Sequence, residues 1–346
     1  MANLAAYVVR RLILLVFVLL GVTILVFAVS MLFTPQQRAL LYIRNAQKVT
    51  PTAIAKVISQ HDLNGPFYVQ YWQWLTQVLG GNLGWSMSAG MPVQSAILRY
   101  WPYTFEIVLF AAPLIILIGI YLGVESAVHK DTVIDHFSRV ISVIGWSLPS
   151  FLVGMLLLAV FFGLLHWFTP GPLSTTNLEL IESKQFHQYT GVNLFDGLLN
   201  GDPFITLDSL RHLVLPVATI VIIDLALLIR VMRSSMLETM SKPYITTAKA
   251  KGVSKRTVIY KHARRNALIP VATLSGMLVA GLLGGLIITE TVFSFGGLGE
   301  WAAQSALALD MPSVLGYAIL SALLFVIANL IVDVLYAYID PRIRLE

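Results

Sequence analysis

The stretch Leu12–Phe33, with the sequence LILLVFVLLGVTILVFAVSMLF, decides the fold class of this chain. It carries no charged side chain, and about 20 helical residues cross the roughly 30 Å hydrocarbon core of a bilayer. A secretory signal is the alternative, because Ala28-Val29-Ser30 loosely resembles a cleavage site. The apolar core of such a signal has only about 7–15 residues. We therefore expect an uncleaved first membrane span.

Five further apolar runs of about this length follow the first. Hydrophobic residues make up 57% of the chain and charged residues only 12%, whereas an average soluble domain has about 25% charged residues. The sequence therefore predicts an all-α polytopic membrane protein with six transmembrane helices. The five further runs are Thr104–Val128, Val140–Phe168, His212–Met232, Ala267–Val292 and Ser313–Tyr338.

The polar stretches between these runs divide the chain into four parts. Residues 1–33 form a cytoplasmic amino terminus and the first span. Residues 34–103, rich in turn signals and tryptophan, form an extracytoplasmic insertion of short helices and loops. Residues 104–338 form a core of five spans, and residues 339–346 form a cytoplasmic tail.

The distribution of basic residues predicts the orientation. With the amino terminus in the cytoplasm, 16 of the 23 lysines and arginines fall in cytoplasmic segments. Positive residues favour the cytoplasmic side of a membrane. Both termini are therefore expected in the cytoplasm, and the protein in the cell (inner) membrane.

Composition also excludes several kinds of site. The chain has no cysteine, which removes thiolate metal sites and disulfides. The net charge of the chain is +5, and its basic residues lie in the segments between apolar spans. This distribution indicates membrane topology rather than nucleic-acid binding. No Gly-x-x-x-x-Gly-Lys-Ser/Thr nucleotide motif occurs, so we expect no cofactor in this chain.

The loop between the fourth and fifth spans, Ser241–Pro270, reads SKPYITTAKAKGVSKRTVIYKHARRNALIP. Ser241 is a plausible helix cap, and Gly252 suits a helix stop in the left-handed conformation. Ser254 is positioned to cap a second helix that continues through His262. The pattern predicts a cationic helical hairpin beside the membrane. The alternative is a solvated basic loop, but its helix start and stop signals favour defined structure.

The same loop resembles the "EAA" loop of binding-protein-dependent ABC importer permeases, and more narrowly that of their dipeptide and oligopeptide branch. Thr246 and Thr247 replace the first two letters that name the loop, as is ordinary in this branch. The resemblance extends over most of the chain, including Arg230-x-x-Arg233-Ser234-Ser235-Met236-Leu237-Glu238. The matching loop positions are Tyr244, Ile245, Thr247, Ala248, Ala250, Lys251, Gly252, His262, Arg265, Asn266, Ala267 and Pro270.

The resemblance implies a function and a set of partners. The hairpin would be a coupling helix seated on an ATPase subunit, and the chain itself would be a non-catalytic permease subunit. The implied partners are a homologous second permease subunit, two cytoplasmic ATPase subunits that bind ATP and Mg²⁺, and an extracytoplasmic substrate-binding protein. The expected coupling residues are Tyr244, Thr247, Ala248, Lys251, Gly252, Val253, Ser254 and His262.

Two acidic residues in the apolar runs are candidates for the translocation pathway or its gate. Asp224 lies near the middle of the fourth run, and Glu290 lies at the outer end of the fifth. An ionisable group inside a membrane is a functional candidate by default. Each also has a structural alternative: Asp224 as a hydrogen-bonding group, and Glu290 as a contact between helices.

Several alternatives stay open for the substrate and the class of protein. Peptides are the expected cargo, and the same architecture also carries nickel chelates and oligosaccharides. A secondary transporter would need ion-binding groups in several spans and paired broken helices, whereas the prolines Pro113, Pro149 and Pro216 are expected only to kink their spans. An intramembrane protease has only the loose match Gly145-x-Ser147.

Overall fold

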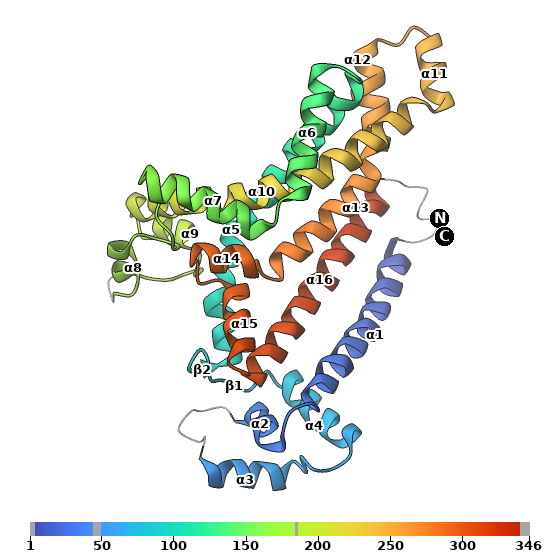
Figure 1. Cartoon of the computed structure of the whole chain (residues 1–346). Helices are drawn as coiled ribbons and strands as arrows, with labels where there is room; N and C mark the ends of the chain where they lie inside the picture. The colour runs from blue at the N-terminus through green and yellow to red at the C-terminus, as the bar shows by residue number, and fades with distance from the viewer. Residues whose placement is uncertain (1–3, 44–49, 184–185, 340–346) are drawn as a thin grey trace.

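The structure, a computed structural model, describes residues 4–43, 50–183 and 186–339 and is almost entirely helical (Figure 1). Among the described residues, the one sheet is an antiparallel pair of two-residue strands, β1 (Trp85–Ser86) and β2 (Met91–Pro92). The predicted all-α class is confirmed.

Five helices in the described part of the chain are long and apolar enough to cross a membrane. A sixth span is present if the bent pair α6 (Val133–Ser147) and α7 (Ser150–Leu158) with its continuation to Leu164 counts as one. The long helices that carry the five straight spans are α1 (Leu4–Ser30), α5 (Val93–Val128), α10 (Pro203–Met240), α12 (Lys255–Thr257) with η4 (Val258–Ala263) and α13 (Arg264–Leu283), and α16 (Met311–Ile339).

The third apolar run, Val140–Phe168, is not one straight helix, and the prediction that Pro149 merely kinks it is wrong. The two halves meet at an angle of 100°. Proline disfavours the helical conformation of the residue before it, and Leu148 is extended with φ −90° and ψ 130°. α7 starts immediately after Pro149 and passes into the π-helical turn η3 (Ala159–Leu164).

The fifth run, Ala267–Val292, is also interrupted. α13 ends at Leu283, and a separate short helix, α14 (Ile287–Phe293), follows before α15 (Leu298–Leu307). Gly285 between them has φ +125°, and a Cβ there would lie 3.1 Å from the Cα of Gly299. A glycine is required here because the end of α13 and the start of α15 approach so closely.

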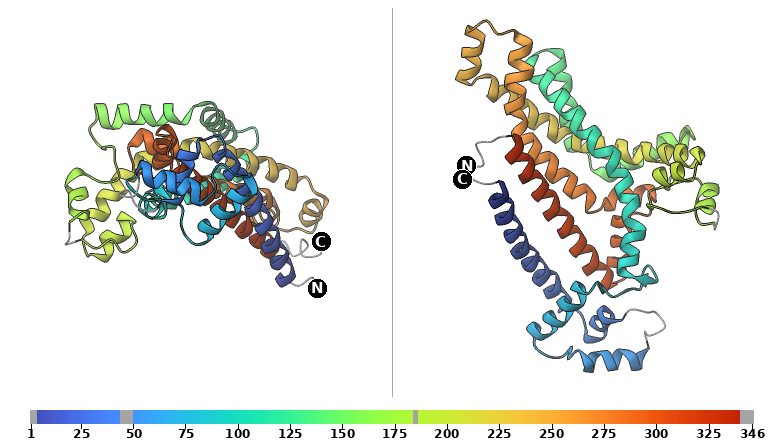
Figure 2. Two further views of the ribbon diagram at one scale, coloured as in Figure 1. Left: turned by 90° about the horizontal axis from the view of Figure 1, so that it is seen from below. Right: turned by 180° about the vertical axis from the view of Figure 1, so that it is seen from behind.

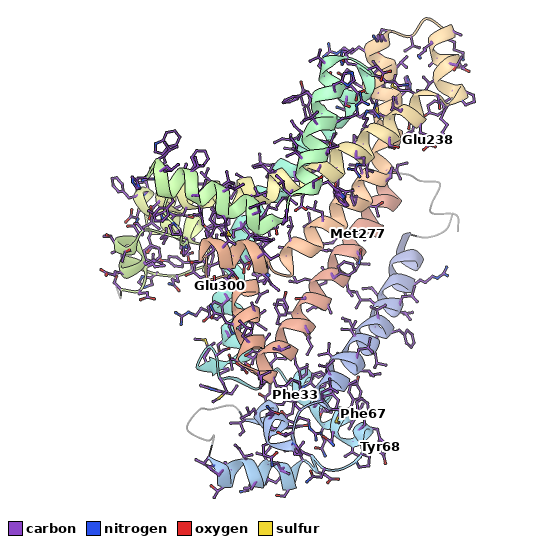
Figure 3. The ribbon with its side chains drawn as sticks, in the orientation of Figure 1. Phe33, Phe67, Tyr68, Glu238, Met277 and Glu300 are labelled. Carbon is purple, nitrogen blue, oxygen red and sulfur yellow. The ribbon has the colours of Figure 1, made fainter. Side chains whose placement is uncertain are left out.

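The short elements gather away from the hairpin. α2 (Pro35–Ala39), η1 (Leu40–Tyr42), α3 (Pro51–Gln60) and α4 (Phe67–Leu79) lie at the opposite end of the molecule from the hairpin, as Figure 1 shows. Figure 3 shows Glu238 near the hairpin, and Phe33, Phe67 and Tyr68 at the far end. A second insertion holds α8 (Thr175–Ile181) and α9 (Asn193–Leu199). The insertion after the first span and the hairpin are therefore separated by the length of the spans.

The main hydrophobic core lies between α5, α10 and α13. A Cβ on Gly119 would lie 2.8 Å from Leu228, and one on Gly123 would lie 2.5 Å from Met232. These glycines of α5 let α10 pack close against it, as small residues do between membrane helices. The views in Figure 2 show the hairpin extending beyond the ends of these helices. Fully buried residues of this core include Ile107, Ala111, Ile115, Leu228, Met232, Met236, Ile245, Ala263, Ala267 and Val271.

Candidate functional site

The predicted hairpin is present between α10 and α13, but its first cap differs from the prediction. α11 (Pro243–Ala250) begins after Lys242, with Pro243 at its first position. Ser241 instead follows the last turn of α10, where its hydroxyl donates to the carbonyl of Glu238 at 2.7 Å. The prediction that Ser241 caps the first helix of the hairpin is therefore wrong, because α10 runs eight residues past the apolar run that ends at Met232.

The turn of the hairpin agrees with the sequence prediction. Gly252 has φ +75°, and its N–H donates to the carbonyl of Lys249 at 3.0 Å. The N–H of Val253 donates to the carbonyl of Ala248 at 3.2 Å, which completes the glycine-based termination common at helix ends. The hydroxyl of Ser254 then accepts the N–H of Thr257 and caps α12. The hairpin is a defined structure, not a slack loop.

The hairpin has an apolar inner face and a polar outer face. Ile245 of α11 is fully buried, and Val258 and Ile259 of η4 are nearly so. Ala248 and Val253 pack against the same core, so they hold the hairpin in place. The residues on the exposed outer face include Thr247, Lys249, Lys251, Gly252, Lys255 and Arg256.

Two tyrosines of the hairpin form hydrogen bonds that join it to the bundle. The hydroxyl of Tyr244 accepts from the Nδ2 of Asn266 at 3.0 Å, which ties α11 to α13. The hydroxyl of Tyr260 donates to the Oε1 of Glu125 at 2.7 Å, near the end of α5. His262 is half-buried, and its carbonyl accepts a second bond from Asn266. The hairpin is therefore bonded to the ends of both α5 and α13.

A buried ion pair fixes the helix ends beneath the hairpin. Both oxygens of Asp135 on α6 accept from Arg233 on α10, at 2.7 and 2.9 Å. Ser126 at the end of α5 donates to the same carboxylate at 2.6 Å, and the N–H of Asp131 donates at 3.0 Å. The Asp135 side chain is fully buried. Two-point contact of this kind fixes geometry as well as adding energy, so α5, α6 and α10 are locked together here.

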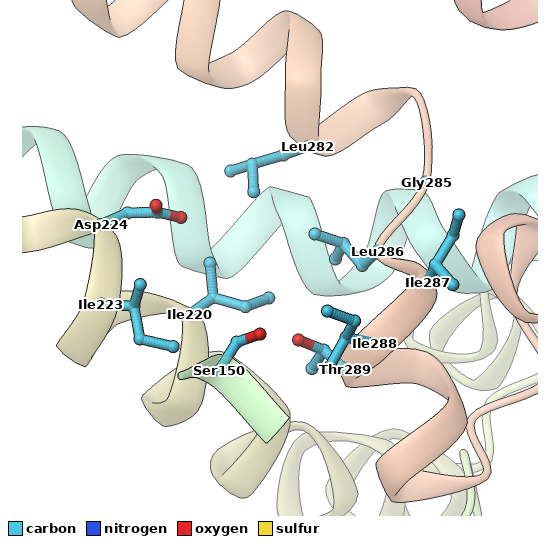
Figure 4. Close-up of a pocket in the computed structure, with 10 residues that line it drawn as sticks. All are labelled: Ser150, Ile220, Ile223, Asp224, Leu282, Gly285, Leu286, Ile287, Ile288 and Thr289. Carbon is cyan, nitrogen blue, oxygen red and sulfur yellow. The ribbon is translucent and has the colours of Figure 1, made fainter. Parts of the chain in front are cut away.

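Asp224, the first pathway candidate, lines a cavity of about 350 Å³ near the middle of α10 (Figure 4). The side chain is half-buried, and no hydrogen-bond donor contacts it among the described residues. Ser150 and Thr289 place hydroxyls in the same cavity, on the side opposite Asp224. The rest of the lining is apolar or backbone: Ile220, Ile223, Leu282, Gly285, Leu286, Ile287 and Ile288.

Glu290, the second candidate, is fully buried and connects three segments. Its Oε1 accepts from the hydroxyl of Thr104 on α5 at 2.6 Å. Its Oε2 accepts from the N–H of Glu300 in the first turn of α15 at 2.9 Å. A Cβ on Gly297 would lie 2.5 Å from this carboxyl group. These contacts favour the helix-contact role of Glu290 over a gate, and Asp224 alone of the two candidates faces the cavity.

Among the buried acids that the sequence interpretation missed, two join the long helices: Asp135 and Glu106. Asp135 lies in the polar stretch between the second and third apolar runs, and nothing in its local sequence pointed to Arg233 as its partner, 98 residues away. Glu106 lies within the second apolar run, where an acidic residue is itself a signal. Its Oε1 accepts from Ser209 at 2.6 Å and from the N–H of Leu194 at 2.9 Å. Glu106 therefore joins α5 to α10 and to the second insertion.

Taken together, these features define a class of protein. A helical membrane protein with several long apolar helices and a cavity beside a broken span suits a transport subunit. Residues 115–345 match the family of binding-protein-dependent transport system inner membrane components. Residues 4–108 match the amino-terminal region of membrane components of the same systems. The chain belongs to this family.

Three relatives resemble the chain over nearly its whole length. A dipeptide transport system permease protein of Alkalihalophilus pseudofirmus is 36% identical, over 98% of this chain and 99% of the relative. A probable D,D-dipeptide transport system permease protein of Escherichia coli is 36% identical over 95% and 94% of the two chains. An oligopeptide transport system permease protein of Bacillus subtilis is 35% identical over 98% and 99%. The chain is thus a multi-pass inner membrane permease subunit of a transporter with further subunits.

Proposed function

We propose that this chain is one permease subunit of an ATP-driven importer of dipeptides and oligopeptides, and that it forms half of the translocation pathway. The relatives named for dipeptide and oligopeptide transport support peptides as the cargo. No observation favours nickel chelates or oligosaccharides as cargo, or a secondary transporter.

The hairpin is the observation that carries the coupling part of this proposal. Its inner face packs into the bundle core through Ile245, and its outer face at Lys251 and Gly252 is exposed. A polar surface that is fixed rigidly to the spans is suited to transmit a movement of a bound partner to those spans. The partner that fits is an ATPase subunit, which supplies the ATP and Mg²⁺ sites that this chain lacks in sequence.

The expected binding protein and second permease subunit follow from the orientation of the molecule in the membrane. We place the hairpin and both termini in the cytoplasm, because 16 of the 23 basic residues then lie inside. The insertion that contains α2 to α4 then faces outward, where an extracytoplasmic binding protein would deliver cargo. A homologous second permease subunit would complete the pathway and bring a second hairpin for the second ATPase subunit.

Reconstitution tests the proposed function. The chain is expressed with the genes adjacent to its own, purified through a tag on this subunit, and placed in liposomes with the external binding protein. We expect a second permease and two ATPase chains to copurify, and labelled dipeptide uptake to require ATP. ATP-independent uptake by the chain alone would contradict the importer assignment and favour a secondary transporter.

A further inference from the structure

The cavity beside Asp224 lies between the break in the third apolar run and the carboxyl-terminal end of α13. Ser150 is the first residue of α7, directly after the break at Pro149, and Gly285–Leu286 is the break between α13 and α14. Irregular backbone at membrane depth is tolerated only where protein buries it or where it lines a wet cavity. Broken helices that meet at such a cavity commonly form substrate sites in transporters. The break at Pro149 and the segment at Gly285–Leu286, directly after the end of α13, therefore face the same space.

Among the residues that the structure describes, Asp224 is the one charged side chain on the wall of this cavity. In the other acids buried among these helices, neighbours donate to the carboxylate: Arg233 to Asp135, Ser209 to Glu106 and Thr104 to Glu290. Asp224 receives no such bond within the described residues, although it sits half-buried among isoleucines. A partly buried carboxylate without a donor is costly and favours a cationic ligand.

The shape and chemistry of the cavity restrict that ligand. A volume of about 350 Å³ is at the small end of the range for small-molecule sites, roughly 300–1,000 Å³. Opposite the carboxylate, the hydroxyls of Ser150 and Thr289 can each donate or accept a hydrogen bond. The apolar wall between them, which includes Ile220, suits short aliphatic side chains. A small molecule with an ammonium group at one end and polar groups beyond it matches all three features.

We propose that Asp224 binds the α-ammonium group of a peptide in transit, and that Ser150 and Thr289 contact the peptide groups beyond it. This inference rests on the proposed peptide importer and adds a recognition step inside the membrane. Asp224 is then a specificity-determining residue, which distinguishes peptides with a free amino terminus from blocked ones. A cation of the second permease subunit is the competing partner for the carboxylate.

Because the chain lacks cysteine, a single thiol can report on occupancy of the cavity. Ile288 lines the cavity and is 48% exposed, so we choose Ile288→Cys as the reporter and follow its alkylation on this subunit by N-ethylmaleimide. The whole complex is assayed in detergent without the binding protein. Alanyl-alanine and N-acetyl-alanyl-alanine are the two probes, and each is titrated against the alkylation rate.

We expect alanyl-alanine to slow alkylation and the acetylated peptide to have no effect. Asp224→Asn in the same background is expected to weaken protection by alanyl-alanine about thirtyfold or more, the fold-change that corresponds to about 2 kcal/mol for removing one partner of a buried charge pair. Asp224→Glu keeps the charge and should keep most of the protection. Glu179→Gln removes an exposed acid on α8 and serves as the matched control that leaves protection unchanged.

Three results would overturn the inference: equal protection by both peptides, equal protection with and without the Asp224 carboxylate, or no protection by either peptide. The last two are also the results expected if a cation of the second subunit occupies the carboxylate. ATP-driven dipeptide uptake by the complex that carries Ile288→Cys alone is measured in parallel. Uptake without protection rejects the role of Asp224 alone, whereas absent uptake in the complex without any substitution rejects the proposed function.

Discussion

Replacement of Gly252 with aspartate is expected to abolish ATP-driven transport while the protein still folds and inserts. Gly252 is exposed at the turn of the hairpin, and a Cβ built there meets no atom within 4 Å. The left-handed conformation costs most residues about 1–2 kcal/mol, and aspartate is among those that tolerate it best. The damage should therefore appear only where a partner approaches the turn, because the variant adds bulk and negative charge to a cationic surface.

The measurement is ATP hydrolysis coupled to peptide uptake in proteoliposomes, with the amount of inserted subunit determined separately. We expect hydrolysis stimulated by the loaded binding protein to fall to the level of the complex without that protein. Gly252→Asn is the matched control, since asparagine has nearly the same size and tolerance of the left-handed conformation but no charge. Normal coupled turnover of Gly252→Asp would refute docking at the turn. Ala248 is a poorer test, because it packs against the core.

Substitution of Asp135 by asparagine is expected to give the largest loss of stability. It leaves Arg233 facing a buried site without its counter-charge, and breaking one side of a buried ion pair costs about 3–5 kcal/mol. The Arg233 side chain is 21% exposed, so the lower end of that range applies. The hydrogen bonds from Ser126 and from the N–H of Asp131 also weaken. The ends of α5, α6 and α10 then lose their common anchor.

Thermal unfolding of the purified complex in detergent measures this loss, with Asp135→Asn compared to the double variant Asp135→Asn/Arg233→Met. The double variant removes both charges and should recover part of the lost stability, because replacing a whole buried pair by apolar groups is often nearly neutral. If the single and double variants are equally destabilised, the uncompensated arginine is not the cause. If neither is destabilised, the ion pair does not anchor the helix ends.

The sequence predicted the parts of the fold that depend on local composition. The apolar runs correspond to the long helices because each needs only its own residues to be apolar. The hairpin turn was predictable at Gly252 and Ser254, because glycine termination and serine capping act within four residues of the chain.

The features that the sequence did not predict depend on contacts between distant segments of the chain. The runs around Pro149 and Gly285 stay apolar through their breaks, so hydrophobicity alone gives no sign that the helices separate. Glu290 was placed correctly in the sequence, but its contacts with Thr104 and Glu300 come from elements that only the fold brings together. Asp224 was selected for its depth in a span, and the structure adds the cavity that it faces.

Site-directed cross-linking tests whether the outer face of the hairpin docks on an ATPase subunit. Lys251→Cys places the chain's one thiol on that face, and Lys56→Cys places it on α3 at the opposite end of the molecule. Each variant complex is treated with a short lysine–thiol cross-linker. We expect a covalent adduct between this chain and an ATPase subunit for Lys251→Cys and none for Lys56→Cys. An assembled, ATP-hydrolysing complex that gives no adduct from Lys251→Cys, or gives one from Lys56→Cys, would contradict this docking.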